Sequence, residues 1–252
     1  MRFKNASAFL LRDTNNCRRW KMKTVIIHGQ NHKGSTYHIA RMLADKVGGE
    51  VTEFFLPRDF SDFCVGCAQC FEKAEEKCPH YEAQQKILHV MDEADLIILA
   101  SPVYVYHASA PMKNFLDHQG HRWMVHRPKP EMFKKQAVCV STAAGAGMKS
   151  TNKDMADSLF FWGVAKTYKM GYAVRAIDWK HVPEKTKQAI EKKTTKAANQ
   201  IRKKNGKVTP GLKTKAFFYA MRFVQKKVGW NKADTDYWNE CGWTGKKRPW
   251  RS

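Results

Sequence analysis

Short apolar segments alternate with amphipathic segments through the middle of this chain, and this alternation constrains the fold more than any other feature. The segment Asp95–Ala100 is apolar after its first residue, as expected of a parallel strand covered on both faces. Strands separated by helices predict βαβ units with right-handed crossovers. We expect the strands at Thr24–His28, Val51–Leu56, Asp95–Ala100, Ala137–Ser141 and Tyr168–Val174. The chain is therefore predicted to form an α/β fold with a doubly wound parallel five-stranded sheet of order 2-1-3-4-5.

The amphipathic segments predict the helices that connect these strands. We expect one helix capped by Ser35 and Thr36, one from about Pro111, and others at Ala83–Glu93, Lys153–Lys166 and Pro183–Lys204. The chain then divides into three parts. These are a basic N-terminal extension (1–22), the sheet domain (23–205) and a basic, aromatic, helical C-terminal extension (206–252).

The net charge of +22 is spread unevenly over the 252 residues. Residues 24–179 carry 18 Lys or Arg against 17 Asp or Glu, whereas residues 180–252 carry 20 against five. The basic ends alone could be attracted to an acidic surface, and salt would screen that attraction. A non-enzymatic protein that binds nucleic acid or membrane through these ends is one hypothesis, but the nearly neutral body disfavours it. No recognised nucleic-acid motif supports a specific nucleic-acid partner.

The segment Ala216–Val228 is apolar with basic residues on one side. It could be a helix on an anionic membrane surface, but packing on the sheet domain or across a dimer is the favoured interpretation. We expect an aromatic clasp that holds the C-terminus, formed by Trp230, Tyr237, Trp238 and Trp243. At the other end, residues 1–22 weakly resemble a transit peptide, and Met22 is favoured as the native start.

Cysteine usage predicts a reducing, cytoplasmic setting. The count of seven is odd, which argues against a complete set of disulfides. The apolar stretch near the start is too short for a secretory signal, and no apolar run approaches the roughly 20 residues of a membrane-spanning helix.

Three loops follow the first, third and fourth predicted strands, so they should converge at the carboxyl edge of the sheet. Gly29–Thr36 combines glycines with hydroxyls at a helix start, where a phosphate is stabilised. Ser101–Ser109 offers flat apolar surface, and Thr142–Gly147 is almost free of side chains. The first two loops also have ordinary interpretations: a strand-to-helix loop with a helix cap, and a pair of packing tyrosines. The first loop lacks both glycine-rich nucleotide fingerprints.

The strings HGQNHKGST, CVGCAQC, ADLIILASPVYVYHASAPMKNFLD and VCVSTAAGAG together resemble the NADPH-dependent FMN reductase family, and within it the iron–sulfur flavoprotein branch. The resemblance covers roughly residues 23–175 and implies a flavodoxin-like fold that binds FMN. It implies phosphate contacts from Gln30, His32, Ser35 and Thr36. It implies that the flavin ring is bordered by Pro102, Val103, Tyr104, Val105, Thr142, Ala143, Gly145 and Gly147. The family more often has Ser-Pro-Arg where this chain has Gln30-Asn31-His32, so the individual phosphate contacts can differ.

Four cysteines form the sharpest local motif, Cys64-x₂-Cys67-x₂-Cys70-x₇-Cys78. Thiolates at intervals of three residues can hold one corner of a 4Fe–4S cluster, and the fourth can close it. The spacing resembles the compact motif of iron–sulfur flavoproteins. Zinc is disfavoured, because structural zinc sites usually pair two C-x₂-C hooks or combine Cys with His. The alternative to a cluster is that the four cysteines are ordinary thiols in a loop at the substrate side or at a dimer contact.

These observations predict an FMN-dependent NAD(P)H oxidoreductase that passes electrons to a quinone, a flavin or a similar small acceptor. The alternative is an iron–sulfur flavoprotein that transfers electrons from a ferredoxin-like donor. A homo-oligomer, dimer or tetramer, is expected in either case. No acid or base is assigned, because the cofactor carries the reaction. His107 is either a proton donor to the acceptor or a partly exposed loop residue, and His118 and His121 are expected on an exposed helix end.

Overall fold

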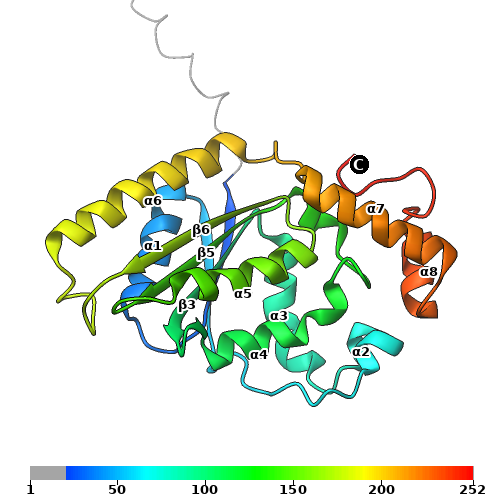
Figure 1. Cartoon of the computed structure of the whole chain (residues 1–252), viewed down its shortest axis with the longest axis horizontal. Helices are drawn as coiled ribbons and strands as arrows, with labels where there is room; N and C mark the ends of the chain where they lie inside the picture. The colour runs from blue at the N-terminus through cyan, green and yellow to red at the C-terminus, as the bar shows by residue number, and fades with distance from the viewer. Residues whose placement is uncertain (1–20, 252) are drawn as a thin grey trace, which may run out of the picture.

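The computed structural model describes residues 21–251, which form one parallel sheet with helices on both faces (Figure 1). The sheet has the order β2-β1-β3-β5-β6, and the short β4 pairs with β3 in antiparallel fashion. The strands are β1 (Lys23–His28), β2 (Glu50–Phe55), β3 (Leu96–Tyr104), β4 (His107–Ala108), β5 (Gln136–Ala143) and β6 (Lys166–Ala173). Counted over the five long parallel strands, this is the predicted order 2-1-3-4-5. The doubly wound, flavodoxin-like fold is confirmed.

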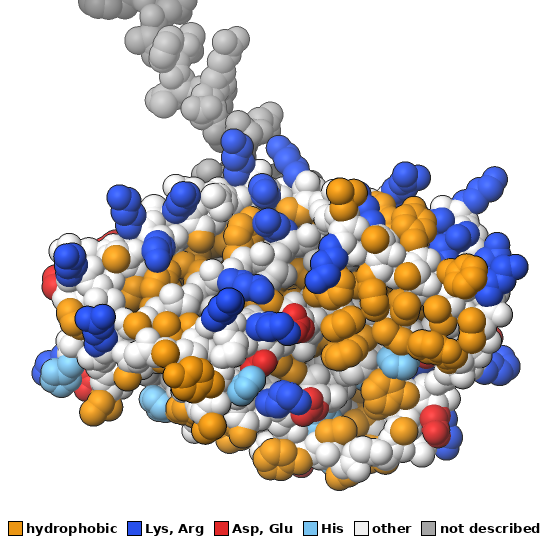
Figure 2. Space-filling view, in the orientation of Figure 1, with side chains coloured by type: hydrophobic (Ala, Val, Ile, Leu, Met, Phe, Trp, Pro, Cys, Tyr) orange, Lys and Arg blue, Asp and Glu red, His pale blue; other side chains and the backbone are white. Residues whose placement is uncertain are grey.

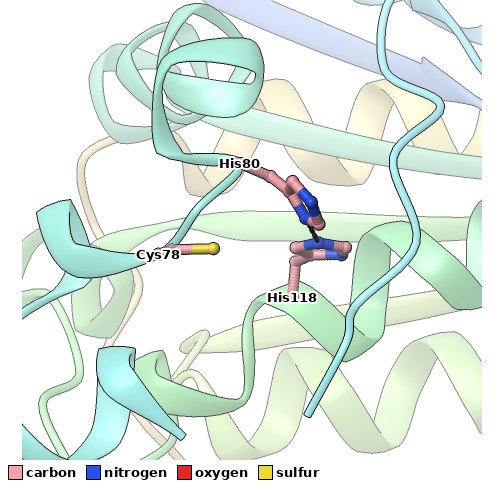
Figure 3. Close-up of side chains that lie close together, drawn as sticks. All are labelled: Cys78, His80 and His118. Atoms are coloured by element: carbon pink, nitrogen blue, oxygen red, sulfur yellow. Dashed lines mark hydrogen bonds between the residues drawn. The ribbon is translucent and has the colours of Figure 1, made fainter. Parts of the chain in front are cut away.

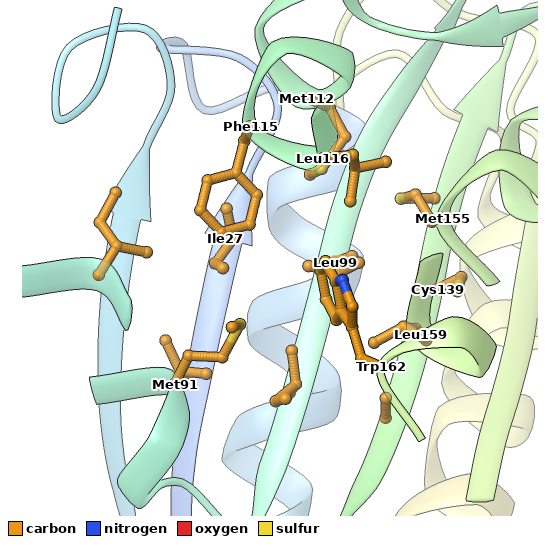
Figure 4. Packing of buried hydrophobic residues seen from close by; sticks show 14 of the residues in the cluster. Ile27, Met91, Leu99, Met112, Phe115, Leu116, Cys139, Met155, Leu159 and Trp162 are labelled. Atoms are coloured by element: carbon orange, nitrogen blue, oxygen red, sulfur yellow. The ribbon is translucent and has the colours of Figure 1, made fainter. Parts of the chain in front are cut away.

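The two faces of the sheet are covered by different helices. On one face lie α3 (Tyr81–Glu93), α4 (Ala110–His118) and α5 (Met148–Phe161), and on the other lie α1 (Ser35–Val47) and α6 (Glu184–Lys204). Successive residues of β3 alternate between the faces: Ile97 and Leu99 pack towards α3, α4 and α5, whereas Ile98 packs towards α1. Figure 4 shows the first of these cores around Leu99. Two buried faces explain why Val25–Ile27, Leu96–Ala100 and Ala137–Val140 in the central strands are apolar at consecutive positions.

The largest differences from the sequence prediction lie next to the carboxyl edge. The third strand does not end at Ala100 but continues to Tyr104 and turns back as β4, so residues 103–108 of the predicted loop 101–109 form a hairpin. The helix predicted at Lys153–Lys166 begins earlier, at Met148 after Gly147, and ends at Phe161. Lys166 instead opens β6 by pairing with Gln136. Strand pairing with distant residues decides these boundaries, and local propensity does not reveal it.

Short helical turns fill the connections after β2 and α4. They are α2 (Gln69–Glu72), η1 (Glu75–Lys77), η2 (Gly120–Arg122) and η3 (Pro130–Lys134). None of the helices within residues 21–251 is both long and apolar enough to cross a membrane.

Met22, the last residue of the predicted N-terminal extension (1–22), packs in the core of the sheet. Residues 1–20 lie outside the described residues. Met22 belongs to the sheet domain, because its side chain is buried in the core under α1 and its carbonyl oxygen accepts a 2.9 Å hydrogen bond from the Glu50 N–H. Gly49, at a φ of +100°, makes this contact possible, since a Cβ there would lie 2.1 Å from the Met22 oxygen.

The C-terminal extension folds as two helices, α7 (Leu212–Lys227) and α8 (Lys232–Glu240), against the sheet domain. Phe218, Trp238 and Trp243 form a buried cluster with Met124 and Phe133 of the sheet domain. Tyr237 joins the cluster and donates a 2.7 Å hydrogen bond to the Pro128 carbonyl. The predicted clasp is thus present in three of its four residues.

Trp230 is the exception, because it is 65% exposed. It lies beyond the end of α7, whose outward face leaves Tyr219 and Phe223 exposed as well. Figure 2 shows hydrophobic and basic side chains side by side over this part of the surface.

Replacement of Phe218 by alanine should lower the free energy of unfolding by about 3–5 kcal/mol, because it leaves a cavity in a fully buried cluster. The matched control is Phe223→Ala on the same helix, where the side chain is 62% exposed and the expected change is within about 0.5 kcal/mol. Urea unfolding followed by tryptophan fluorescence measures both. Equal effects of the two substitutions would show that the extension does not pack as described.

Candidate functional site

The loops after β1, β3 and β5 meet at the carboxyl edge of the sheet. The Thr36 and Thr142 hydroxyls share a 2.6 Å hydrogen bond, although 106 positions separate them in the sequence. The Ser109 hydroxyl donates a 2.5 Å hydrogen bond to the Gly29 carbonyl. A Cβ at Gly147 would lie 2.5 Å from Val103 Cγ1. The three loops expected to converge therefore touch one another directly.

The start of α1 has the properties of an anion site. Its first backbone bond runs from the His38 N–H to the Gly34 oxygen, so the N–H groups of Ser35, Thr36 and Tyr37 have no acceptor within the helix. The Ser35 hydroxyl is buried and has no hydrogen-bond partner among the described residues. The first turn carries no acidic residue. Unpaired donors and the positive end of the helix dipole favour a phosphate here.

The side chains of Gln30 and His32 lie next to the same helix start. A Cβ at Gly34 would lie 3.2 Å from Gln30 Nε2 and 3.0 Å from His32 Nε2. All four residues suggested for phosphate contact are thus gathered at one place. The expected cap is wrong, however: Gly34 is the N-cap residue, without a side-chain bond, and Thr36 bonds to Thr142 instead.

The hairpin between β3 and β4 forms an exposed apolar wall beside this anion site. Tyr104, Val105 and Tyr106 are 49%, 93% and 63% exposed. Val105 and Tyr106 form the turn with φ angles of 49° and 65°, a conformation that is unfavourable for a β-branched residue in particular. Strain of this kind gathers at ligand sites, where the surroundings hold it in place. Here Ser150 supports the turn by donating a hydrogen bond to the Tyr106 carbonyl.

The loop after β5 is open at Gly145. Gly145 is exposed, and a Cβ built on it would meet nothing within 4 Å. Pro102 and Thr142 are buried register partners in β3 and β5, whereas Val103 and Ala143 are half-buried. The edge therefore combines an anion site with a flat apolar surface, which fits a planar cofactor that carries a phosphate.

Asp154 is a residue of this edge that the sequence reasoning missed. Its carboxylate lies 3.0 Å from His107 Nδ1 and accepts a 3.0 Å hydrogen bond from the Ala108 N–H. It reaches β4 from α5, across 46 positions of sequence. No local signal could identify that pairing.

A second cluster of reactive side chains lies in the loop after β2. Cys64, Cys67, Cys70 and Cys78 all line one cavity of about 100 Å³. Burial and the neighbouring thiols of Cys78 and Cys64 raise the pKa of Cys70 to about 11. The four cysteines of the motif identified in the sequence thus line the same cavity.

His118 and His121 are not on an exposed helix end, which corrects the sequence prediction. Both are buried, and both use Nδ1 to contact a carbonyl oxygen: Asn114 at 2.9 Å for His118, and His118 at 3.1 Å for His121. His118 also lines the cysteine cavity, together with His80. Neither the burial of His118 nor its proximity to the cysteines has a signal in the local sequence.

Glu75 anchors the cysteine loop to the sheet domain. Its carboxylate lies 3.1 Å from His121 Nε2 and 2.8 Å from Lys129 Nζ, with Arg122 at 3.7 Å. Burial alone would raise the pKa of Glu75, but the hydrogen bond to His121 and the charges of Arg122 and Lys129 outweigh it and hold that pKa well below its ordinary value. The carboxylate is therefore charged in the folded protein.

Comparison with known proteins identifies related sequences. Residues 22–180 match the model of the NADPH-dependent FMN reductase family. An iron-sulfur flavoprotein of Archaeoglobus fulgidus is 30% identical over 128 residues, which are 50% of this chain and 54% of that protein. An iron-sulfur flavoprotein of Methanocaldococcus jannaschii is 38% identical over 100 residues, 38% of this chain and 51% of that protein. The chain spans about half the length of the curated relatives that it matches.

Solved structures share the fold at lower identity. An FMN-dependent NADH-azoreductase of Bacillus anthracis in complex with FMN superposes with a TM-score of 0.53 and 11% identity, over 71% of this chain and 99% of that one. An NAD(P)H:quinone oxidoreductase of Methanothermobacter marburgensis gives a TM-score of 0.54 and 14% identity, over 72% and 96%.

Replacement of Glu75 by glutamine should lower the free energy of unfolding by about 2 kcal/mol at pH 7, because the hydrogen bonds with His121 and Lys129 lose their charged partner. The folded-state pKa of Glu75 is depressed, so its contribution is complete above the ordinary value of 4.5 and is lost as the pH falls below it. The difference between the wild type and the variant should therefore shrink below about pH 4.5. Urea unfolding at pH 7 and pH 4 measures it, with exposed Glu76→Gln as the control. A pH-independent difference would contradict the charge argument.

Proposed function

Because this chain belongs to the NADPH-dependent FMN reductase family, we propose that it is an FMN-dependent oxidoreductase that passes electrons from NADH or NADPH to a quinone, a flavin or a similar small acceptor. One observation carries the proposal. The hydrogen-bond donors at the start of α1 that lack an acceptor within the helix lie at the same sheet edge as an exposed apolar hairpin. The two halves match the phosphate and the ring of one ligand.

The phosphate of FMN is assigned to the start of α1. The free N–H groups of Ser35 and Thr36 and the unpartnered Ser35 hydroxyl supply donors, and Gln30 and His32 cover the site from the loop. Hydrogen bonds from such groups to a charged phosphate are stronger than those between neutral partners. No acidic residue of the first turn opposes the charge.

The flavin ring is assigned to the space between the hairpin and the loop after β5. The hairpin contributes Pro102, Val103, Tyr104 and Val105, and the facing loop contributes Thr142, Ala143, Gly145 and Gly147. FMN supplies the hydride chemistry when it is bound, taking a hydride from the nicotinamide and giving two electrons to the acceptor. The chain orients the ring and excludes water from one of its faces. Because the wall is open and apolar, it suits small planar acceptors.

His107 is held by Asp154 beside the hairpin. A role as proton donor to the acceptor stays a prediction, as do the homo-oligomer and the cytoplasmic setting.

A second candidate is an iron–sulfur flavoprotein that receives electrons from a ferredoxin-like donor. The observation that favours it is that the four cysteines line one cavity, and relatives with that name match this chain. Four thiolates in one cavity fit a 4Fe–4S cluster. This candidate requires iron and sulfide in the protein and slow turnover with NADH and NADPH.

The deciding experiment is anaerobic purification followed by a visible spectrum, extraction of the flavin and turnover with NADH or NADPH and a quinone. The favoured function predicts a yellow protein with about one FMN per chain and rapid oxidation of the nicotinamide. Colourless protein that does not take up added FMN would overturn it. Brown protein with iron, sulfide and little NAD(P)H activity would establish the second candidate.

Replacement of Ser35 by alanine should weaken FMN binding by about 10- to 100-fold, because a hydrogen bond to a charged group contributes about 1.5–3 kcal/mol. The fold should tolerate the change, since the Ser35 hydroxyl has no partner among the described residues. Thr24→Val is the matched control: the Thr24 hydroxyl is also buried and unpartnered, but it lies at the opposite end of β1. Fluorescence titration of the apoprotein with FMN measures both. Equal affinities of the two variants would contradict the phosphate assignment.

A further inference from the structure

Two histidines join one of the cysteines in the cavity of the cysteine loop. Cys78 Sγ and one ring nitrogen each of His80 and His118 all lie within 4.8 Å of one another (Figure 3). Cys78 and His80 precede α3, whereas His118 is the last residue of α4. The sequence argument against zinc was that structural zinc sites usually pair two C-x₂-C hooks or combine Cys with His. The fold removes that argument by bringing His118 to the motif across 38 positions of sequence from His80.

We propose that Cys78, His80 and His118 bind a single Zn²⁺ ion. The separation of His80 Nδ1 and His118 Nε2 is 3.1 Å. Two nitrogens bound tetrahedrally to one zinc at the usual bond length lie about 3.3 Å apart, so the two imidazoles are already placed as a ligand pair. A thiolate and two imidazoles form the donor set of a catalytic or tethering zinc site, with water in the fourth position.

The surrounding groups orient two of the three ligand atoms. His118 Nδ1 lies 2.9 Å from the Asn114 carbonyl, which can only accept, so Nδ1 carries the proton and Nε2 presents its lone pair to the site. Gln84 Nε2 points at Cys78 Sγ from 3.7 Å, which favours a thiolate acceptor. Gln84 is itself fixed, because its Oε1 accepts a 2.7 Å hydrogen bond from Gln119. Partners of this kind are typical of the second layer around a metal.

The ion would join the cysteine loop to the cofactor edge through α4. His118 ends this helix, and Ser109, whose hydroxyl bonds to Gly29, caps its beginning. The zinc ion would tether the cysteine loop to α4, and this proposal does not depend on the flavin function. It competes with the iron–sulfur cluster, since both need Cys78.

The test is metal analysis of anaerobically purified protein, with flavin measured in the same samples. The zinc site predicts about one zinc per chain with no acid-labile sulfide. His80→Ala and Cys78→Ser should lose the zinc, and Cys64→Ser should keep it, because Cys64 lies outside the ligand set. A 4Fe–4S cluster would show the reverse: about four irons and four sulfides, lost in Cys64→Ser and kept in His80→Ala. That result would overturn the proposal whatever the flavin content.

Metal-free protein provides a second measurement. Titration with Zn²⁺ against a chelating dye should give a tight site that is weakened more than about 100-fold in His80→Ala and about 10-fold in Gln84→Leu. Substitution with Co²⁺ should produce tetrahedral visible bands and one thiolate charge-transfer band, which Cys78→Ser removes. An apoprotein that retains its fold by circular dichroism but binds neither ion at micromolar concentration would overturn the proposal.

Discussion

The parallel register of β1, β3 and β5 is the constraint on which the rest of the structure depends. Ile27 pairs with Leu99, and Leu99 pairs with Cys139, so the three strands reach the carboxyl edge at the same level. The loops that follow these strands therefore lie in contact with one another. Small residues allow their backbones to approach closely. At Gly29 a Cβ would lie 2.6 Å from the Ser109 hydroxyl. Burial of both sheet faces fixes this register, because a slip by one residue would exchange every side chain between the two cores.

The sequence predicted the three central strands β1, β3 and β5 because each contains a run of consecutive apolar residues that is buried on both sides. The alternation of strands with helices predicted the order of the sheet. The sequence could not predict that Ser101–Tyr104 continues β3, since that depends on pairing with β5 and β4. It placed the candidate flavin residues in loops that the structure brings together, but it missed Asp154 and Glu75 entirely. Each of these carboxylates acts on a partner 46 positions away. The burial of His118 and His121 was misjudged for the same reason.

The basic C-terminal extension has a structural role, because it forms hydrogen bonds that hold the cysteine loop in place. Asn231 donates a 2.6 Å hydrogen bond to the Phe71 carbonyl in the cysteine loop, and Arg127 donates a 3.1 Å bond to the same oxygen. Arg127 is in turn paired with Asp234 of α8. The C-terminal extension therefore stabilises the cysteine loop through Asn231, and Glu75 connects the same loop to His121 and Lys129. Figure 1 shows α8 beside α2, in agreement with these bonds. The exposed lysines of the extension are not needed for this role.

Helix α4 connects the cofactor edge to the cysteine cavity, whatever the cysteine loop binds. The helix has nine residues, so about 13 Å separate its start at the cofactor edge from its end at the cysteine cavity. A redox-inert ion at the far end would leave the electrons paired on the flavin and the nicotinamide, which suits hydride transfer. An iron–sulfur cluster there would instead accept electrons singly and make the loop a relay. Under the proposed flavin function, the identity of the metal would therefore decide whether electrons move in pairs or singly at this edge of the sheet.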